Sequence, residues 1–301
     1  MTSSSEQFMQ RSSAALQQPD KALRLDQLGL WMPLVRDAAV ARYGDFDALR
    51  AHLKQVRSHT RDNLEHYLTR FEEEAVSNGN QLHFACTGAQ MNDLVLSICQ
   101  RHQARRVIKG KSMVTEETGL NSHLQRSGLT VVETDLGEYI IQQAGETPSH
   151  IVGPALHKSQ AEIRQLFLDK HKLGARPLEQ VEDIVAEART LLREQFLQAD
   201  VGIIGANALI AENGYSMLVT NEGNGDLCAN LPPVLIICTT MERILPRADD
   251  AAALQRLLVR SATGQAQTAY TSFYSGPAAR TKPTARWKPT SFCWTTGVAR
   301  Y

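Results

Sequence analysis

Two glutamates, Glu212 and Glu222, stand beside glycine and asparagine in the otherwise apolar stretch GANALIAENGYSMLVTNEGNG, residues 205–225. A desolvated, well-positioned glutamate can act as a nucleophile. The stretch also contains Asn207 and Asn224, whose amides can donate and accept hydrogen bonds. Three interpretations stay open: the glutamates are catalytic, they line a pocket together with the asparagines, or they are the polar ends of a hairpin.

The segment KGKS, residues 109–112, lies between a predicted strand and a predicted helix. Lys109, Lys111 and Ser112, together with the positive end of the helix, form a candidate anion-binding or substrate-binding site. The segment is not a P-loop, because the pattern GxxxxGK[ST] is incomplete. The alternative is a helix cap flanked by solvated lysines.

Further acidic and amide side chains follow along the chain. Glu117 and Asn121 lie one helical turn apart, so we expect them on one face as candidate ligand contacts, although Glu117 also suits a helix N-terminus. In ETDLGEYI, residues 133–140, a predicted strand ends and a helix begins, and ligands bind at this edge of open α/β sheets. Asp135 is a suitable helix cap, which leaves Glu133 as the better pocket candidate.

Histidines and cysteines indicate a catalytic or metal site less strongly. His150 and His157 flank the end of a predicted strand, and His157 is the preferred general base because neutral imidazole titrates near physiological pH. A surface histidine is the alternative. The five cysteines form no CxxC pair and no HxxH or HExxH occurs, so the sequence predicts no metal site in this chain.

The spacing of apolar residues predicts the elements that must position these side chains. About 75 residues of helical periodicity come first, and short apolar runs then alternate with amphipathic segments. Thr115 is the expected N-terminal cap of the helix over 115–128. We expect strands over 82–86, 105–110, 129–135, 149–154, 199–214, 215–222 and 232–240, and helices over 87–102, 115–128, 136–145, 159–171, 177–200 and 249–262.

This order predicts an α/β fold with a mainly parallel sheet flanked by helices. The Asn213-Gly214 step predicts a hairpin, and therefore some antiparallel pairing as well.

Charge and composition exclude several function classes. Lysines and arginines number 32, as do aspartates and glutamates, so the balance gives no attraction to nucleic acid. No apolar run is long enough for a membrane span, and the N-terminus lacks the apolar core of a signal peptide. We therefore expect a cytoplasmic protein.

Several motifs occur in order at family-typical separations: KSM, ETDLGEYI, PSHIV, GAN and NEGN, followed by PPVLIICTTMERILP. Over residues 75–275 the chain resembles the lactate-utilisation iron–sulfur protein family, which contains the LUD domain. The resemblance implies a fold similar to the ribose-phosphate isomerase and CoA-transferase group. It also implies a cytoplasmic complex with two other lactate-utilisation subunits that oxidises L-lactate to pyruvate for growth on lactate.

The family member of this type normally continues into a ferredoxin-like module with two [4Fe–4S] clusters that carry electrons. The cysteines of that module are absent here, so the resemblance implies that this chain binds no cofactor by itself and is inactive alone. Two alternatives stay open. One is a CoA- or phosphosugar-binding enzyme of the same fold with Glu212 as nucleophile, and the other is a non-catalytic scaffold subunit.

The expected organisation is a helical region over 1–75, a LUD domain over 76–275 and an irregular basic tail over 276–301. Relatives have a strand resembling EEFHLVLLDNGRS where this chain reads FCWTTGVA, and a one-base shift of suitable codons interconverts VLLDNGRS and FCWTTGVA. We therefore expect the tail to be an out-of-frame translation whose missing strand leaves a sheet edge open, with a genuine short tail as the alternative. Sequencing the gene decides between them.

Overall fold

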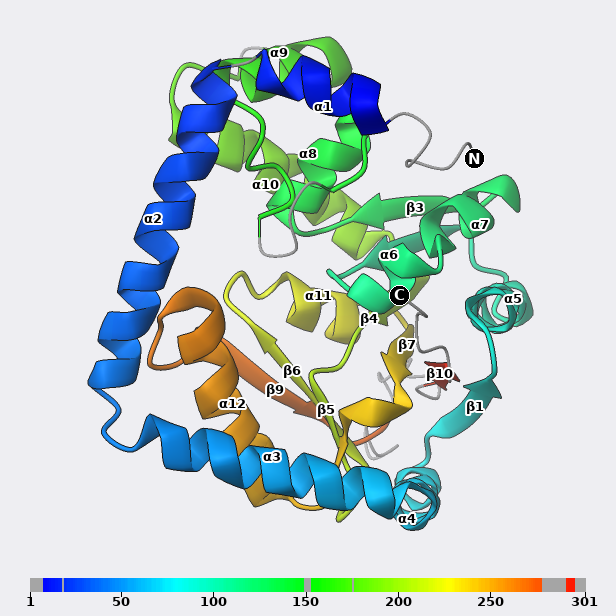
Figure 1. The fold of residues 1–301 in the computed structure, drawn as a ribbon. Helices are drawn as coiled ribbons and strands as arrows, with labels where there is room; N and C mark the ends of the chain where they lie inside the picture. Colours follow the sequence, from blue (N-terminus) through cyan, green and yellow to red (C-terminus); the bar gives the residue numbers. More distant parts are fainter. Residues whose placement is uncertain (1–7, 18, 149–152, 175, 278–290, 296–301) are drawn as a thin grey trace.

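The computed structural model describes residues 8–17, 19–148, 153–174, 176–277 and 291–295. Figure 1 shows a central sheet with helices packed around it and a second, smaller sheet beside it. The fold is therefore α/β, as the alternation of elements predicts.

The central sheet has six strands, all parallel, in the order β1-β10-β7-β4-β2-β3. Its strands β2, β4 and β7 are rich in valine and isoleucine because both of their faces are buried. Its strands, in chain order, are β1 (Gln81–Ala85), β2 (Arg106–Lys109), β3 (Thr130–Glu133), β4 (Val201–Ile204), β7 (Val234–Thr240) and β10 (Ser291–Thr295).

Alternate residues of these strands enter two separate cores, since successive side chains point to opposite faces. Ile203 and Ile236 pack with α5 and α7, whereas Ile204 and Ile237 pack in the core that contains α8 to α11. The helices that cover the sheet are α5 (Gly88–Arg101), α6 (Met113–Glu117), α7 (Leu120–Arg126), α8 (Leu136–Ala144), α9 (Gln160–Lys170), α10 (Val181–Leu197) and α11 (Asn224–Asn230).

The second sheet has four strands in the order β8-β5-β6-β9 and carries the third core, under α3 and α12. The hairpin predicted at Asn213-Gly214 is confirmed, because β5 and β6 pair antiparallel with Ile210 opposite Tyr215. The elements are β5 (Ala208–Ile210), β6 (Tyr215–Thr220), β8 (Ile244–Leu245), β9 (Tyr270–Tyr274) and α12 (Ala248–Thr263).

One expected strand, over 199–214, is wrong as a single element. The chain leaves the central sheet after Ile204 and enters the second sheet at Ala208. Gly205 permits this crossing because its α-carbon lies close to Ser112: a β-carbon there would come within 3.1 Å of the Ser112 Oγ. The crossing thus places residues 205–207 between the two sheets.

The helix expected over 115–128 is also interrupted. Gly119 has a φ of 66°, in the left-handed region, and separates α6 from α7. The helix begins earlier than expected, with Ser112 at the cap position, so Thr115 lies inside the first turn and donates its hydroxyl to the Ser112 carbonyl at 2.8 Å.

The tail expected to be irregular contains a strand. Residues 291–295 form β10, which pairs in parallel with β1 on one side and β7 on the other. The expected open edge at this place in the sheet is therefore wrong, because β10 is an interior strand. The predicted strand over 149–154 lies mostly outside the described residues, as does His150.

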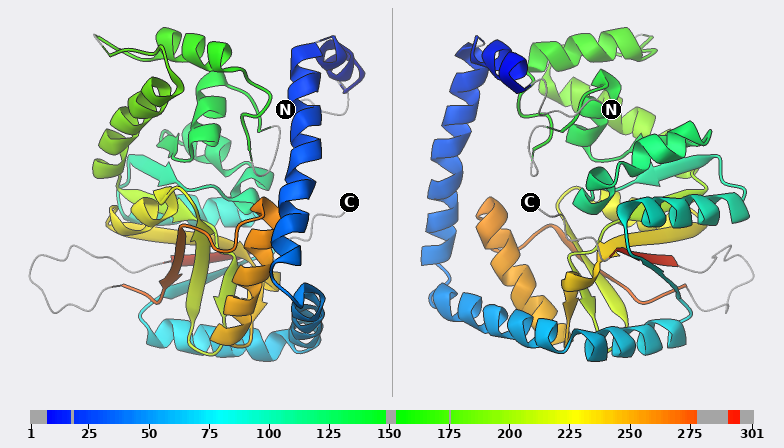
Figure 2. Two further views of the ribbon diagram at one scale, coloured as in Figure 1. Left: turned by 90° about the vertical axis from the view of Figure 1, so that its left-hand side faces the viewer. Right: turned by 45° about the vertical axis from the view of Figure 1, so that its right-hand side comes forward.

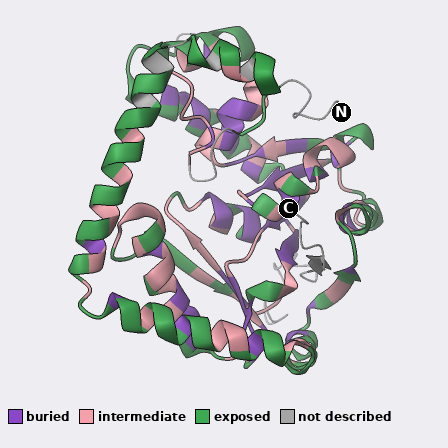
Figure 3. Ribbon diagram, viewed as in Figure 1, coloured by how far each residue is buried: buried purple, intermediate pink, exposed green. Residues whose placement is uncertain are grey.

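The N-terminal region is helical, as predicted. Its helices are α1 (Phe8–Leu16), α2 (Pro19–Ala41), α3 (Phe46–Asp62) and α4 (Leu64–Ser77). Figure 2 shows α2 standing along one side of the molecule, and most of its residues are exposed (Figure 3). The domain boundaries at residues 75 and 275 stay predictions.

No helix in the described ranges combines the length and the apolar character that a membrane crossing requires.

Candidate functional site

A cavity of about 350 Å³ opens where the central strands end and the second sheet begins. Its walls come from the segments after β2, β3 and β4, from the end of β6 and from the last turns of α12. This is the carboxyl edge of a parallel sheet, where open α/β folds bind their ligands. The polar side chains among its lining residues are those of Lys111, Ser112, Asp135, Asn207, Thr220, Asn221, Glu222, Asn224, Arg243, Thr263, Gln265 and Thr268.

The cavity brings together five of the residues selected from the sequence. These residues are Lys111, Ser112, Asn207, Glu222 and Asn224. They come from three separate segments, which meet because the chain crosses between the sheets at residues 205–207. The cavity also includes Arg243, which the sequence analysis did not select, so two cationic side chains line it.

Two of the three asparagines in the cavity lining, Asn207 and Asn224, are held in place by hydrogen bonds. The Asn207 Oδ1 accepts the backbone N–H of Val219 at 2.8 Å, which secures the start of the second sheet. The Asn224 Nδ2 donates to the Thr134 Oγ1 at 3.2 Å, and the Thr134 hydroxyl donates to the Lys109 carbonyl at 2.9 Å. Asn224 thus connects the cavity to the ends of β2 and β3.

The acidic residues of the cavity differ in their roles. The Asp135 Oδ1 accepts the backbone N–H of Glu138 at 3.1 Å and caps α8, as predicted. Glu222 is exposed at the cavity rim, where its carboxylate accepts the Thr220 hydroxyl at 3.2 Å. Glu222 therefore lacks the desolvation that a glutamate nucleophile requires.

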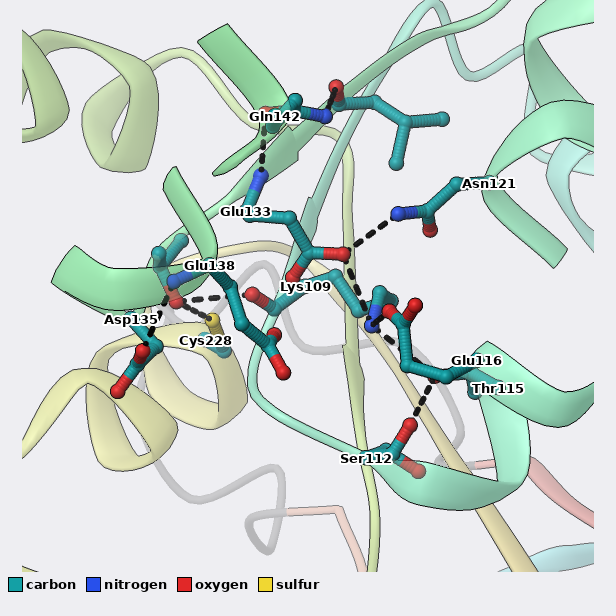
Figure 4. A network of polar contacts seen from close by, with 12 residues as sticks. Lys109, Ser112, Thr115, Glu116, Asn121, Glu133, Asp135, Glu138, Gln142 and Cys228 are labelled. Carbon is teal, nitrogen blue, oxygen red and sulfur yellow. Dashed lines mark hydrogen bonds and ion pairs between the residues drawn. The ribbon is translucent and has the colours of Figure 1, made fainter. Parts of the chain in front are cut away.

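Lys109 lies behind the cavity, not in its lining. The residue is fully buried, and β3 pairs with β2 so that Glu133 lies directly opposite it. We call Lys109, Glu116, Glu133 and Glu138 the buried charge cluster (Figure 4). The Lys109 Nζ lies 3.0 Å from Glu133 Oε1 and 3.2 Å from Glu116 Oε1.

The protonation of the cluster follows from its charges. Burial by itself lowers the pKa of Lys109, but the surrounding carboxylates outweigh this effect and raise it. Burial, followed by the neighbouring charge of Glu133, raises the pKa of Glu138 to about 8 although Lys109 opposes the shift. Lys109 is therefore a buried ammonium, and Glu138 holds a proton near neutral pH when no other cation is present.

Two further predicted residues belong to this region. The Asn121 Nδ2 donates to Glu133 Oε1 at 2.5 Å, so Asn121 and Glu133 meet each other and not the cavity. Glu117 is exposed on α6 and lies outside both the cavity lining and the cluster. The shared face expected for Glu117 and Asn121 is lost because Gly119 separates their helices.

Two of the candidate catalytic residues lie elsewhere. The His157 Nε2 lies 2.8 Å from the Glu146 Oε2, and hydrogen bonds from Lys158 and His157 outweigh burial to lower the pKa of Glu146. Glu212 is exposed, and its Oε2 accepts the N–H of Ala248 at the start of α12 at 3.0 Å. Neither side chain lines the cavity.

Sequence reasoning missed Arg243, Glu116 and Glu138. Glu138 follows the cap Asp135 by three residues, where a glutamate usually turns back to the helix N-terminus. Glu138 is buried because β2 and β3 lie next to α8, and this arrangement cannot be predicted from a local sequence pattern. For Arg243 a signal existed, since CTTMERILP follows a predicted strand whose carboxyl end must reach the same sheet edge.

Comparison with known proteins places this geometry in a family. The family model described as "LUD domain" matches residues 68–286. "Lactate utilization protein B" from Anoxybacillus flavithermus is 43% identical over 240 residues, covering 79% of this chain and 50% of that protein. The protein of the same name from Bacillus licheniformis is 38% identical over 272 residues, covering 90% of this chain and 54% of that protein.

Among solved structures, a DUF162 family protein from Deinococcus radiodurans aligns with a TM-score of 0.42 at 12% identity, covering 77% of this chain and 98% of that one. The chain spans about half the length of the curated relatives it matches. From the extent of the family match and the identity to these relatives, the chain belongs to the LUD-domain family.

Proposed function

We propose that this chain is the LUD-domain part of a lactate-utilisation protein and that its cavity binds a small carboxylate of the lactate and pyruvate class. The observation that carries the proposal is the 43% identity over 240 residues with a protein named for lactate utilisation. The cavity supports it, because Lys111 and Arg243 supply positive charge at the carboxyl edge of the sheet.

The lining residues suit a 2-hydroxy or 2-oxo acid. Lysine and arginine side chains bind carboxylates by charge-assisted hydrogen bonds. Ser112 and Asn224 add a hydroxyl and an amide that can bind the ligand's second oxygen. In this proposal these residues bind and orient the acid, and the Asp135 carboxylate is committed to capping α8.

The four cysteines whose side chains the structure describes do not fit an iron–sulfur cluster. Such a cluster needs four thiolates that converge. Cys99 and Cys238 are buried in the core on one face of the sheet, Cys228 is buried on the other face, and Cys86 is exposed. We therefore propose that oxidation of L-lactate and transfer of its electrons use clusters and subunits outside the described part of this chain.

Calorimetric titration of the purified chain with L-lactate and with pyruvate tests the binding proposal. We expect Lys111→Ala and Arg243→Ala each to weaken binding roughly tenfold, since a charge-assisted hydrogen bond contributes about 1.5–3 kcal/mol. Lys158→Ala is the matched control, because Lys158 pairs with Glu146 outside the cavity. Binding of acetyl-CoA or phosphate but not of either acid would contradict the proposal and favour a CoA or phosphosugar ligand.

Growth tests the cellular role. A strain that lacks the gene should fail to grow on L-lactate but grow normally on glucose. Restoring the natural gene should restore growth on L-lactate, and the same gene with Lys111→Ala and Arg243→Ala should not. Normal growth of the deletion strain on L-lactate would contradict the proposed role.

A further inference from the structure

The buried charge cluster has more hydrogen-bond acceptors than donors. An ammonium has three donors, and Lys109 directs them to Thr115 Oγ1, Glu116 Oε1 and Glu133 Oε1. Glu133 Oε2 and Glu138 Oε2 remain, and when both carboxyls are ionised neither accepts a hydrogen bond from a described residue. Both residues are only 3% exposed, so these carboxylate oxygens are also shielded from bulk water.

The Asn121 amide, which bonds to the other oxygen of Glu133, also has an unpaired atom. The Asn121 amide uses its Nδ2 to donate to Glu133, and its buried Oδ1 has no partner among the described residues. Unpaired buried acceptors destabilise a fold by roughly 1–3 kcal/mol each, and more when they are charged. The two carboxylate oxygens of Glu133 and Glu138 therefore indicate that a proton or a cation lies between them.

Charge gives the same indication independently. The cluster combines three carboxylates with one ammonium, so its ionised form carries two excess negative charges, with Glu133 and Glu138 buried and the Glu116 side chain 27% exposed. Buried charge requires a partner of opposite sign. A single divalent cation neutralises this excess.

The spacing of the oxygens suits such an ion. Glu116, Glu133 and Glu138 each offer one carboxylate oxygen, and these oxygens all lie within 4.8 Å of one another. Hard cations bind oxygen at about 2.0–2.6 Å, so oxygens around one ion are separated by at most about 4–5 Å. Carboxylate and amide oxygens are the ligands that Mg²⁺, Mn²⁺ and Ca²⁺ prefer.

We propose that Glu116, Glu133 and Glu138 bind a hard divalent cation through one carboxylate oxygen each. Glu133 then binds Lys109 through one carboxylate oxygen and the cation through the other. The ligands come from α6, β3 and α8, so no short sequence motif contains all of them. The sequence predicted no metal site because only the spacings of histidines and cysteines were considered.

The position of the site gives it a role beyond neutralising charge. Lys109 is followed by Gly110, Lys111 and Ser112, which line the cavity. This segment lies between β2 and α6. A cation that binds α6, β3 and α8 therefore holds in place the elements next to the segment. The proposed ion is thus a positioning element for the cavity, and its binding does not depend on which acid the cavity takes.

The test is a titration of the purified full chain, first stripped with EDTA, with Mn²⁺ followed by electron paramagnetic resonance. We expect one Mn²⁺ per chain, displaced by excess Mg²⁺ or Ca²⁺. Glu138→Gln and Glu133→Gln should each weaken Mn²⁺ binding at least roughly tenfold. Glu117→Gln is the matched control, because it makes the same change on an exposed side chain of α6 and should leave the affinity unchanged.

Glu116→Gln provides a second variant that should fold, since 27% of this side chain is exposed. Mn²⁺ should raise the melting temperature of the unmodified chain but not that of Glu116→Gln, because only a cation bound to the folded state stabilises it. The proposal is overturned if the unmodified chain binds no Mn²⁺ at about 1 mM, the weak end of protein cation sites. Equal affinity in Glu116→Gln, Glu138→Gln and the Glu117→Gln control would overturn it as well.

Discussion

Lys109 and Lys111 stand two residues apart, yet one belongs to the buried charge cluster and the other to the cavity. Lys109 is the last residue of β2, where the register with β3 places it opposite Glu133. Lys111 lies beyond the strand, where the chain turns toward the cavity. The two lysines of KGKS therefore have different roles. The end of β2 lies between them, so Lys109 is in the protein interior and Lys111 is at the cavity.

The largest difference between the two regions should appear in stability. Lys109→Met leaves buried carboxylates without their cation and should lower the free energy of unfolding by about 3–5 kcal/mol. Lys111→Met should change it by less than about 0.5 kcal/mol. Urea unfolding of both variants in EDTA measures the difference, and equal losses would show that Lys109 is not the counter-charge of the cluster.

The next largest difference is expected between the reaction rates of a buried thiol and an exposed thiol. Burial raises the pKa of Cys228 to about 12, although its hydrogen bond with Thr134 lowers it, whereas Cys86 is exposed. Since three pKa units reduce the reactive thiolate roughly 1000-fold, iodoacetamide should label Cys228 far more slowly than Cys86 at pH 8.

Peptide mass spectrometry measures the two labelling rates, and urea should equalise them as a control. Rapid labelling of Cys228 in the folded protein would mean that α11 readily opens away from Thr134.

Asn224 should show how strongly the two regions are coupled. Asn224→Ala removes the hydrogen bond that Thr134 Oγ1 accepts and should cost about 0.5–1.5 kcal/mol of unfolding free energy, the net contribution of one hydrogen bond, because Thr134 keeps its bond to the Lys109 carbonyl. Asn230→Ala is the control on the same helix, where the exposed amide bonds only to the Asp226 carbonyl. Thermal and urea unfolding measure both variants, and an equal small loss would indicate that the cavity and cluster are independent.

The smallest effect is expected at Glu212. Glu212→Ala removes an acceptor from the first N–H of α12 and should cost about 0.5–1 kcal/mol, in the range of helix caps. Binding of pyruvate should be unchanged in the same variant. Loss of binding in calorimetry, with little loss of stability, would instead restore Glu212 as a ligand-site residue.

Sequence patterns predicted those parts of the fold that depend on local periodicity. The apolar run 232–240 and the Asn213-Gly214 turn gave β7 and the β5–β6 hairpin, because burial and turn geometry are encoded within a few residues. The crossing at residues 205–207 was not predictable in this way. An apolar strand on either side of it reads as one continuous strand.

The candidate site was predicted in part for the same reason. Residues that follow strand ends, such as Ser112 and Asn207, reached the cavity because all parallel strands end at one edge. Glu133 was assigned to a pocket although it faces Lys109, and only the pairing of β2 with β3 decides between these two positions. Glu138 and Arg243 needed the same three-dimensional information.

The pairing of Lys109 with Glu133 also has a consequence for how the sheet aligns. β3, at the edge of the sheet, has a valine on each face, Val131 in one core and Val132 against the other, so a slip of β3 by one residue against β2 would exchange one valine for the other and lose little apolar burial. Such a slip would, however, place the carboxylate of Glu133 beside apolar neighbours and leave Lys109 without its opposite charge. The ion pair therefore selects one alignment of β3 against β2 among several that bury similar apolar surface.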